Sequence, residues 1–280
     1  MQLQAYKSSL IEKLQRHYTV REAKQIAIRI FEAKLGLRRA EQVLEAQQEL
    51  NPAQTAEIDQ MLAELGKGIP IDYLLGETVF FGYDFIVDPS VLIPRPETEE
   101  LVQLILERET DRQLEILDIG TGSGCIPIAL KLEGKYKQVD ACEVSEPALK
   151  LATKNAAKLK AEVNLFLLDI LTQIPEGTYE VIVSNPPYVF KEELDGLDPK
   201  VVEYEPRIAL SPEGKPLQFY HRILSILPEF AKPGARIYFE IHEEMGEKVD
   251  VLMRHYGLQS VEVLEDMYGR DRFAFGIYPS

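Results

Sequence analysis

Residues 115–124 read EILDIGTGSG, and this stretch decides the fold. Its first four residues form a short apolar run ending in Asp118, which is typical of a buried strand. Glycines follow at 120, 122 and 124, and an apolar helical pattern begins immediately after them. Alternating glycines let the backbone bend sharply and lie against a ligand with no Cβ in the way. We therefore predict a strand, a ligand-binding turn and a helix in succession.

The rest of the chain after residue 114 repeats this alternation of apolar strands and amphipathic helices, which predicts a parallel α/β sheet. The final two strands are separated by a polar loop without a helix, so the last strand should be antiparallel to its neighbours. The predicted fold class is α/β, with a Rossmann-like, mostly parallel sheet that ends in an antiparallel hairpin. The predicted strands are 115–118, 139–144, 163–168, 181–184, 236–241, 261–264 and 273–278.

The residues before this sheet have a different character. Residues 1–75 are predicted to form a helical domain, with a capping box at Thr19 and Glu22 and a second helix start at Asn51-Pro52. They contain no chemical motif, so we expect them to dock a protein substrate. Residues 76–95 are predicted to be a β-hairpin linker with its turn at 88–90, and residues 96–280 the catalytic domain.

Composition limits the function classes. The chain has 280 residues and a formal charge of -15; residues 1–75 hold 10 Lys/Arg and 10 Asp/Glu, which leaves 21 against 36 afterwards. Such a surface repels a phosphate backbone, so no direct nucleic-acid binding is expected. The two cysteines, Cys125 and Cys142, lack metal-ligand spacing, so no metal is expected and a reducing cytoplasm fits. No signal peptide, apolar span or membrane association is predicted.

Two acidic residues close the strands that follow the glycine turn. Glu143 ends the second strand, where a carboxylate can accept two hydrogen bonds from a ribose diol. Asp169 ends the third strand, where it could accept from an adenine amine, with Ile170 beside the ring. The spacing Gly-x-Gly-x-Gly fits a nucleoside with a methionine tail better than a pyrophosphate. The predicted cofactor is S-adenosylmethionine.

The sequence Asn185-Pro186-Pro187-Tyr188 directly follows the fourth strand and indicates the reaction. Two prolines fix the backbone, so the Asn185 side-chain carbonyl and the Pro186 backbone carbonyl can accept from one NH2 group. Tyr188 can stack on the planar group that carries this NH2. Such a turn would position an amide or an aromatic amine for attack on a sulfonium methyl. The acidic run from 192 to 205 beside it is predicted to be a solvated loop.

Nearly the whole chain resembles the HemK/PrmC family, the release-factor glutamine methyltransferases. The resemblance rests on the motifs LIPRPETE at 92–99, DIGTGSG at 118–124, NPPY at 185–188 and Glu205-Pro206, and on Asp266, Gly269, Asp271 and Arg272. The chain departs from the family at Lys215-Pro216, where Asp-Gly is frequent, and at His242 and Glu244 or Met245, where Gly and Gln are usual.

The resemblance implies a Rossmann-like S-adenosylmethionine-dependent methyltransferase domain that acts on the glutamine of the Gly-Gly-Gln loop of peptide chain release factors. It implies cofactor binding by the residues Gly120, Thr121, Gly122, Ser123, Gly124, Glu143, Ile170 and Asn185, to which the strand topology adds Asp169. It also implies substrate binding by Asn185, Pro186, Pro187 and Tyr188, of which Asn185, Pro186 and Tyr188 are the predicted catalytic residues.

Three other functions were considered. The Asn-Pro-Pro-Tyr turn would equally serve a methyltransferase acting on an exocyclic amine of adenine or guanine in nucleic acid, which the negative charge disfavours. A non-catalytic protein that binds release factors would not need the intact turn at Asn185 or the glycines. An NAD-dependent dehydrogenase would require the spacing Gly-x-Gly-x-x-Gly, which is not present in this turn.

Overall fold

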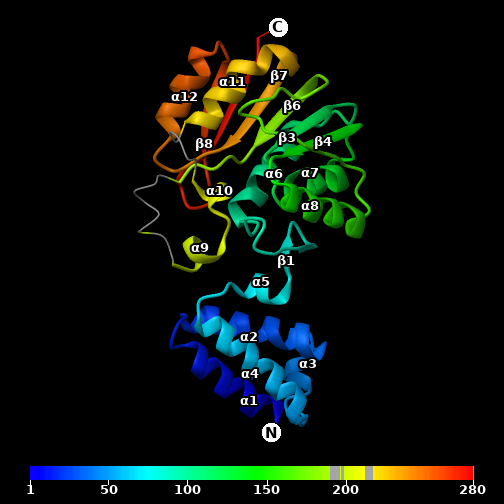
Figure 1. Ribbon diagram of the computed structural model, residues 1–280, viewed down its shortest axis with the longest axis vertical. Helices are drawn as coiled ribbons and strands as arrows, with labels where there is room; N and C mark the ends of the chain where they lie inside the picture. The colour runs from blue at the N-terminus through cyan, green and yellow to red at the C-terminus, as the bar shows by residue number, and fades with distance from the viewer. Residues whose placement is uncertain (190–195, 197–198, 212–216, 280) are drawn as a thin grey trace. The chain divides into compact units, whose positions relative to one another are not determined.

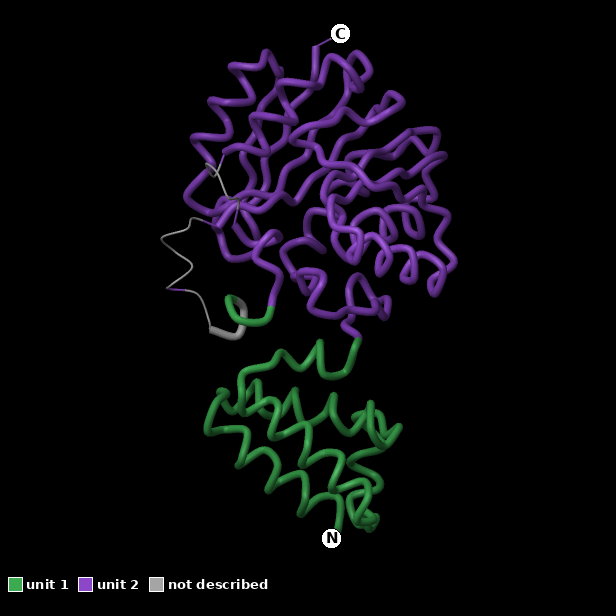
Figure 2. The backbone as a smooth tube through the Cα atoms, viewed as in Figure 1, with its two compact units in different colours: residues 1–76, 199–204 green, residues 77–198, 205–280 purple. Residues whose placement is uncertain are grey.

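The computed structural model describes residues 1–189, 196, 199–211 and 217–279. The chain divides into two compact units, as Figure 2 shows: residues 1–76 with 199–204, and residues 77–198 with 205–280. Within the described ranges, no helix combines the length and apolar character needed to cross a bilayer.

The smaller unit is helical. Its core consists of apolar side chains from within residues 3–65, including Leu10, Ile30 and Ile58. Both predicted helix starts are confirmed, because Thr19 with Glu22 and Asn51 with Gln54 form capping boxes. The helices are α1 (Leu3–Leu14), α2 (Val20–Leu35), α3 (Arg39–Leu44), α4 (Pro52–Gly66), α5 (Ile71–Leu75) and α9 (Pro199–Tyr204).

Helix α9 belongs to the smaller unit although it is distant in sequence. The Tyr204 hydroxyl donates to the backbone carbonyl of Lys67 over 2.9 Å, a contact between residues 137 positions apart. The sequence pattern did not predict this pairing. A segment that follows the Asn-Pro-Pro-Tyr turn thus has its contacts in the helical unit.

The larger unit contains a seven-stranded sheet with the order β5-β4-β3-β6-β7-β9-β8 (Figure 1). Strands β5, β4, β3, β6 and β7 pair in parallel, whereas β9 pairs antiparallel with both β7 and β8, so the predicted sheet is confirmed. The strands are β3 (Glu115–Ile119), β4 (Gln138–Glu143), β5 (Asn164–Leu167), β6 (Tyr179–Ser184), β7 (Ala231–Glu240), β8 (Gln259–Glu265) and β9 (Asp271–Ile277).

Helices cover both faces of this sheet (Figure 1). Successive strand residues point to opposite faces, so Ile116 and Val181 pack with one group of helices while Leu117 and Ile182 pack with the other. The first group is α6 (Pro96–Arg108), α7 (Cys125–Ala129), the π-helical turn η1 (Leu130–Gly134) and α8 (Glu146–Leu159). The second group is α11 (Gln218–Phe230) and α12 (Gly246–His255).

The hairpin before the sheet differs from the prediction in the position of its turn. Strands β1 (Glu77–Phe80) and β2 (Tyr83–Ile86) pair antiparallel around Phe81-Gly82, not around 88–90. Phe81 and Gly82 have φ of 51° and 79°, which suits a two-residue turn whose twist matches the strands. The Glu99 carboxylate accepts from the Phe81 amide over 2.7 Å and fixes this turn.

An ion pair between the half-buried Arg95 and the buried Glu205 holds the segment that includes α10 (Arg207–Leu210) against residues 93–95. The Arg95 guanidinium donates to Glu205 over 2.6 Å, and the Ile93 amide donates to the other oxygen over 3.3 Å. The Val189 amide also donates to the Leu210 carbonyl over 3.0 Å. The Glu205 side chain is 1% exposed, so the prediction that the acidic run is solvated is wrong at this residue.

We expect Arg95→Ala to lower the free energy of unfolding by about 2 kcal/mol, the scale of a hydrogen bond to a charged group. Among the described residues, the substitution leaves the buried Glu205 carboxylate with the Ile93 amide as its remaining donor. Denaturant unfolding would measure the change. Lys150→Ala, which breaks an exposed ion pair with Glu146, is the control and should have no measurable effect. Equal stability of the two variants would contradict the assignment.

Candidate active site

The predicted site residues follow four adjacent strands at one edge of the sheet. Ile119 pairs with Cys142 of β4 and with Ser184 of β6, and Glu143 pairs with Leu167 of β5. Parallel strands in register end together, so the loops after them leave the sheet side by side. The structure therefore brings together the glycine turn, Glu143, the residues after β5 and the Asn-Pro-Pro-Tyr turn.

The turn after β3 has the backbone conformation that its glycines predict. Gly120, Gly122 and Gly124 have φ of 78°, 55° and 80°, a region that residues with a Cβ rarely adopt. A Cβ placed on Gly120 or Gly122 would meet no atom within 4 Å, so both face open space. The turn therefore presents bare backbone, as a close-fitting ligand requires.

A buried asparagine holds this turn in place. The Asn155 side chain on α8 is fully buried, and its Nδ2 donates to the Ser123 carbonyl over 2.9 Å. The same side chain exchanges hydrogen bonds with the backbone of Ile86 in β2. Asn155 thus ties the β1–β2 hairpin and the glycine turn to α8.

Asp118 and Thr121 place unpartnered oxygens beneath the turn. Asp118 is fully buried, and neither of its carboxylate oxygens has a hydrogen-bond partner among the described residues; the Thr121 hydroxyl is in the same position. Burial raises the pKa of Asp118 to about 7; the nearby Thr121 side chain opposes this shift, and the Glu143 carboxylate adds to it. A cationic ligand would favour the ionised form and supply the missing partner.

Glu143 is buried and already engaged by backbone amides. One of its oxygens accepts from Gly122 over 2.8 Å, and the other accepts from Val144 and Ser145, both over 2.9 Å. A carboxylate has about four acceptor sites, so one remains for a ribose hydroxyl, and the prediction that Glu143 accepts from both hydroxyls of the diol is reduced to one. Glu143 therefore couples the shape of the glycine turn to the end of β4.

Asp169 and Ile170 lie after β5, as predicted. The Asp169 carboxylate accepts from the Leu171 amide over 2.9 Å and from the Thr172 hydroxyl over 3.0 Å. Ile170 is buried, and its carbonyl accepts from Arg222 on α11. Each oxygen of Asp169 keeps one acceptor site that an adenine amine could use. This role of Asp169 stays a prediction.

The Asn-Pro-Pro-Tyr turn is held by side chains from two other elements. Asn185 Nδ2 donates to the Thr98 hydroxyl at the start of α6 over 3.3 Å, and the Tyr188 hydroxyl donates to Glu240 at the end of β7 over 3.0 Å. Pro186 is buried between these two half-buried residues. The turn is therefore anchored at both ends.

Glu240 joins the two anchors. Thr98 donates to one of its carboxylate oxygens over 2.8 Å while Tyr188 donates to the other, and Glu240 is 1% exposed. Burial raises the pKa of Glu240 to about 7, against the effect of these hydrogen bonds and of the Arg272 charge. Burial also raises the pKa of the Tyr188 hydroxyl, which therefore stays a donor.

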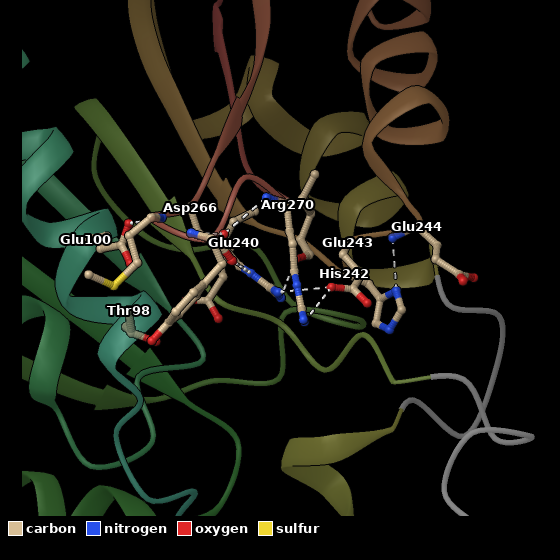
Figure 3. A network of polar contacts seen from close by, with 12 residues as sticks. Thr98, Glu100, Glu240, His242, Glu243, Glu244, Asp266 and Arg270 are labelled. Carbon is tan, nitrogen blue, oxygen red and sulfur yellow. Dashed lines mark hydrogen bonds and ion pairs between the residues drawn. The ribbon is translucent and has the colours of Figure 1, made fainter. Parts of the chain in front are cut away.

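Further polar contacts surround this centre (Figure 3). Arg272 donates to the buried Asp266 over 3.3 Å, and Arg270 pairs with Glu243 over 2.9 Å. His242, one of the departures from the family pattern, packs the edge of its ring against Tyr188 with centroids 6.1 Å apart. The other departure, Lys215-Pro216, lies outside the described residues.

Sequence reasoning gave no role to Asp118, Thr98, Asn155 or Glu240. Asp118 and Glu240 had a usable signal, because each is an acidic residue that closes or nearly closes an apolar strand, as Glu143 does. Thr98 and Asn155 lie on helices, and their partners are 87 and 69 positions away in sequence. No local pattern identifies such pairs.

Comparisons with known proteins agree with this geometry. Residues 97–211 match the family described as methyltransferase small domain, and residues 8–76 match the PrmC N-terminal domain. Among solved structures, a methyltransferase from Pyrococcus furiosus aligns with a TM-score of 0.55 at 20% identity, covering 79% of this chain and 100% of that one. The fold is that of the S-adenosylmethionine-dependent methyltransferases.

Two curated relatives are similar over nearly their whole length. The release factor glutamine methyltransferase of Bacteroides thetaiotaomicron is 37% identical over 93% of this chain and 95% of its own. That of Flavobacterium psychrophilum is 36% identical over 97% and 98%. The chain belongs to the release factor glutamine methyltransferase family.

The two glycines 122 and 124 provide a matched test of the turn. Gly122→Ala should weaken S-adenosylmethionine binding at least tenfold, because the new Cβ occupies space open to a ligand. Because alanine is strained at the positive φ of this position, the substitution should also lower the free energy of unfolding by roughly 1–2 kcal/mol. Gly124→Ala places a Cβ 3.1 Å from Ile128 and 3.2 Å from Ala152, so it should destabilise the fold more strongly. Calorimetry and denaturant unfolding separate the effects. Native affinity in Gly122→Ala would remove this turn from the cofactor site.

Proposed function

We propose that this chain transfers a methyl group from S-adenosylmethionine to the side-chain amide nitrogen of the glutamine in the Gly-Gly-Gln loop of peptide chain release factors. The observation that carries the proposal is the anchored Asn185 amide. Its Nδ2 is used by Thr98, which leaves Oδ1 as a neutral acceptor beside the Pro186 carbonyl. The names of the curated relatives support the same substrate.

The residues around the glycine turn fit the cofactor. S-adenosylmethionine, when bound, supplies an electrophilic methyl group on a sulfonium and carries an ammonium on its methionine tail. We assign the tail to the backbone of 120–124, where the unpartnered oxygens of Asp118 complement its positive charge. Glu143 and Asp169 with Ile170 are assigned to the ribose and the adenine, respectively.

The Asn-Pro-Pro-Tyr turn fits an amide better than a basic amine. An amide nitrogen is neutral and has no proton to lose before methyl transfer, so a neutral acceptor pair can hold its two hydrogens and position it. The new nitrogen–carbon bond would form as the methyl–sulfur bond breaks, and one of the two hydrogens would then leave as a proton to solvent. The same carbonyl oxygens complement the positive charge that develops on the nitrogen during transfer. The Tyr188 ring, tied through its hydroxyl to Glu240, is assigned to the face of the amide plane.

Methylation of an exocyclic amine of adenine or guanine is the alternative. The same turn would accept such an amine, and one solved structure with this fold is an rRNA methyltransferase of T. thermophilus in complex with AdoMet and guanosine, with a TM-score of 0.53 at 17% identity. That likeness concerns the fold alone. The charge of -15 and the names of the curated relatives favour the protein substrate.

We also propose that residues 1–75 dock the release factor and that residues 96–280 carry out the chemistry, joined by 76–95. Support comes from the match of 8–76 to the PrmC N-terminal domain, and from α9, which follows the Asn-Pro-Pro-Tyr turn but has its contacts in the helical unit. Release factors act at the ribosome, so we place the reaction in the cytoplasm.

Mass spectrometry of a release factor after incubation with the chain and S-adenosylmethionine tests the substrate. We expect one methyl group, located on the glutamine of the Gly-Gly-Gln loop. A factor with Gly-Gly-Glu in its place is the control and should stay unmodified, since a carboxylate offers no amide nitrogen. Methylation of ribosomal RNA or DNA under conditions that leave the factor unmodified would establish the alternative.

A chain that begins at residue 77 tests the docking role. It should bind S-adenosylmethionine with native affinity, because the predicted cofactor residues lie beyond residue 118. Methylation of the whole release factor should fall at least tenfold, whereas a short Gly-Gly-Gln peptide should react as with the full chain. If the shortened chain methylates the whole factor at the full rate, residues 1–75 do not dock it.

A further inference from the structure

Above its pKa of about 7, the Glu240 side chain is an ionised carboxylate, and its charge fixes the direction of each hydrogen bond around it. An ionised carboxylate accepts hydrogen bonds and cannot donate. The Thr98 hydroxyl, 2.8 Å from Glu240, therefore directs its single hydrogen at that oxygen. Its own oxygen then has lone pairs left and no hydrogen, so Thr98 must act as the acceptor towards Asn185, 3.3 Å away.

This direction decides which way the Asn185 amide faces. The two ends of an asparagine amide have nearly the same shape, so packing alone distinguishes them poorly. An acceptor at Thr98 selects the orientation with Nδ2 towards Thr98 and Oδ1 on the opposite side. The reversed orientation would place Oδ1 against the Thr98 oxygen, with no hydrogen between them, and would present NH2 to a substrate NH2.

We propose that Glu240, acting through Thr98, is a positioning residue that fixes the Asn185 amide with its oxygen towards the methyl-accepting nitrogen. This inference rests on the proposed function, because it assumes a substrate that donates hydrogen bonds from NH2. Neither Glu240 nor Thr98 touches the reacting atoms in this scheme. They set the orientation of the Asn185 amide, which does contact the methyl-accepting nitrogen.

The second oxygen of Glu240 extends the same control to Tyr188. The Tyr188 hydroxyl donates to it over 3.0 Å, so one carboxylate fixes the first and the last residue of the Asn-Pro-Pro-Tyr turn. Glu240 itself is placed by the sheet, since Phe239 pairs with Ser184 of β6 and the Tyr220 hydroxyl donates to the Glu240 carbonyl over 2.9 Å. The positioning group is therefore more rigid than the loop it positions.

Two substitutions separate this role from general support of the fold. Thr98→Val keeps the shape but removes the acceptor, so Asn185 loses its selected orientation. Glu240→Gln keeps the shape but turns one acceptor into a donor, so residue 240 can no longer accept from both hydroxyls. Either Thr98 receives a hydrogen bond and directs its own hydrogen at Asn185 Oδ1, or Tyr188 loses its acceptor. Thr98→Ser retains the hydroxyl, and Thr153→Val removes an exposed threonine hydroxyl on α8 as a matched control.

The experiment measures methylation of a whole release factor at saturating cofactor, with cofactor affinity by calorimetry and the melting temperature of each variant. We expect kcat to fall on the order of 100-fold in Glu240→Gln and at least tenfold in Thr98→Val, the scale of a misplaced reacting group. KM for the factor and cofactor affinity should change far less than kcat, because only the contacts of the Asn-Pro-Pro-Tyr turn are altered and the other binding residues are untouched. Thr98→Ser and Thr153→Val should react at nearly the native rate.

Repeating both substitutions in an Asn185→Ala background decides the mechanism. In that background Thr98→Val should not lower kcat further, because the amide through which Thr98 acts is absent, whereas Glu240→Gln should cause only the loss that follows from its contact with Tyr188, which Tyr188→Phe measures alone. A loss from Thr98→Val that multiplies with the loss from Asn185→Ala overturns the inference, as does a native kcat in either single variant. If Thr98→Val does not fold, Thr98→Ala, which also removes the hydroxyl, takes its place. A native chain that leaves the factor unmodified in this assay refutes the proposed function instead.

Discussion

The parallel pairing of β3 with β6 is the constraint on which the whole site depends. Ile119 lies opposite Ser184, and the Ser184 hydroxyl donates to the Ile119 carbonyl over 2.7 Å within the fully buried core. The glycine turn and the Asn-Pro-Pro-Tyr turn therefore leave the sheet at the same height. A shift of two residues in the register of β3 and β6 would separate the two turns by roughly 7 Å, which is too far for direct transfer of a methyl group.

The sequence was sufficient to predict the sheet, because buried parallel strands are continuous apolar runs and each is bounded by a recognisable helix or turn. The sequence-based prediction failed at the β1–β2 hairpin, where one pair of residues determines the point at which the chain reverses. Phe81-Gly82 reads as the middle of an aromatic strand, but Gly82 permits a two-residue turn that the Glu99 carboxylate then fixes from α6. The grouping of α9 with the helical unit was equally hidden, since its contact at Lys67 is 137 positions away.

The site was predictable to the extent that its residues end strands. Glu143, Asp169 and Asn185 follow strands in sequence, and topology alone brings such positions to one edge. The residues that orient them, Thr98, Asn155 and Glu240, come from two helices and from β7. These residues matter because of their burial and the direction of their hydrogen bonds, which cannot be read from a single sequence. Asp118 shows the difference: its place in the motif was visible, but its two unpartnered oxygens and raised pKa became evident only in the folded chain.

The position of α9 has a consequence for the order in which the protein is completed during synthesis. The core of the helical unit lies within residues 3–65, so it can close while the sheet is still being translated. Residues 199–204 reach it only after β3 to β6 have emerged, and the chain then returns to the sheet for β7, β9 and β8. Central strand β6 is therefore left with an open edge while residues 199–204 are synthesised, until β7 emerges and covers it.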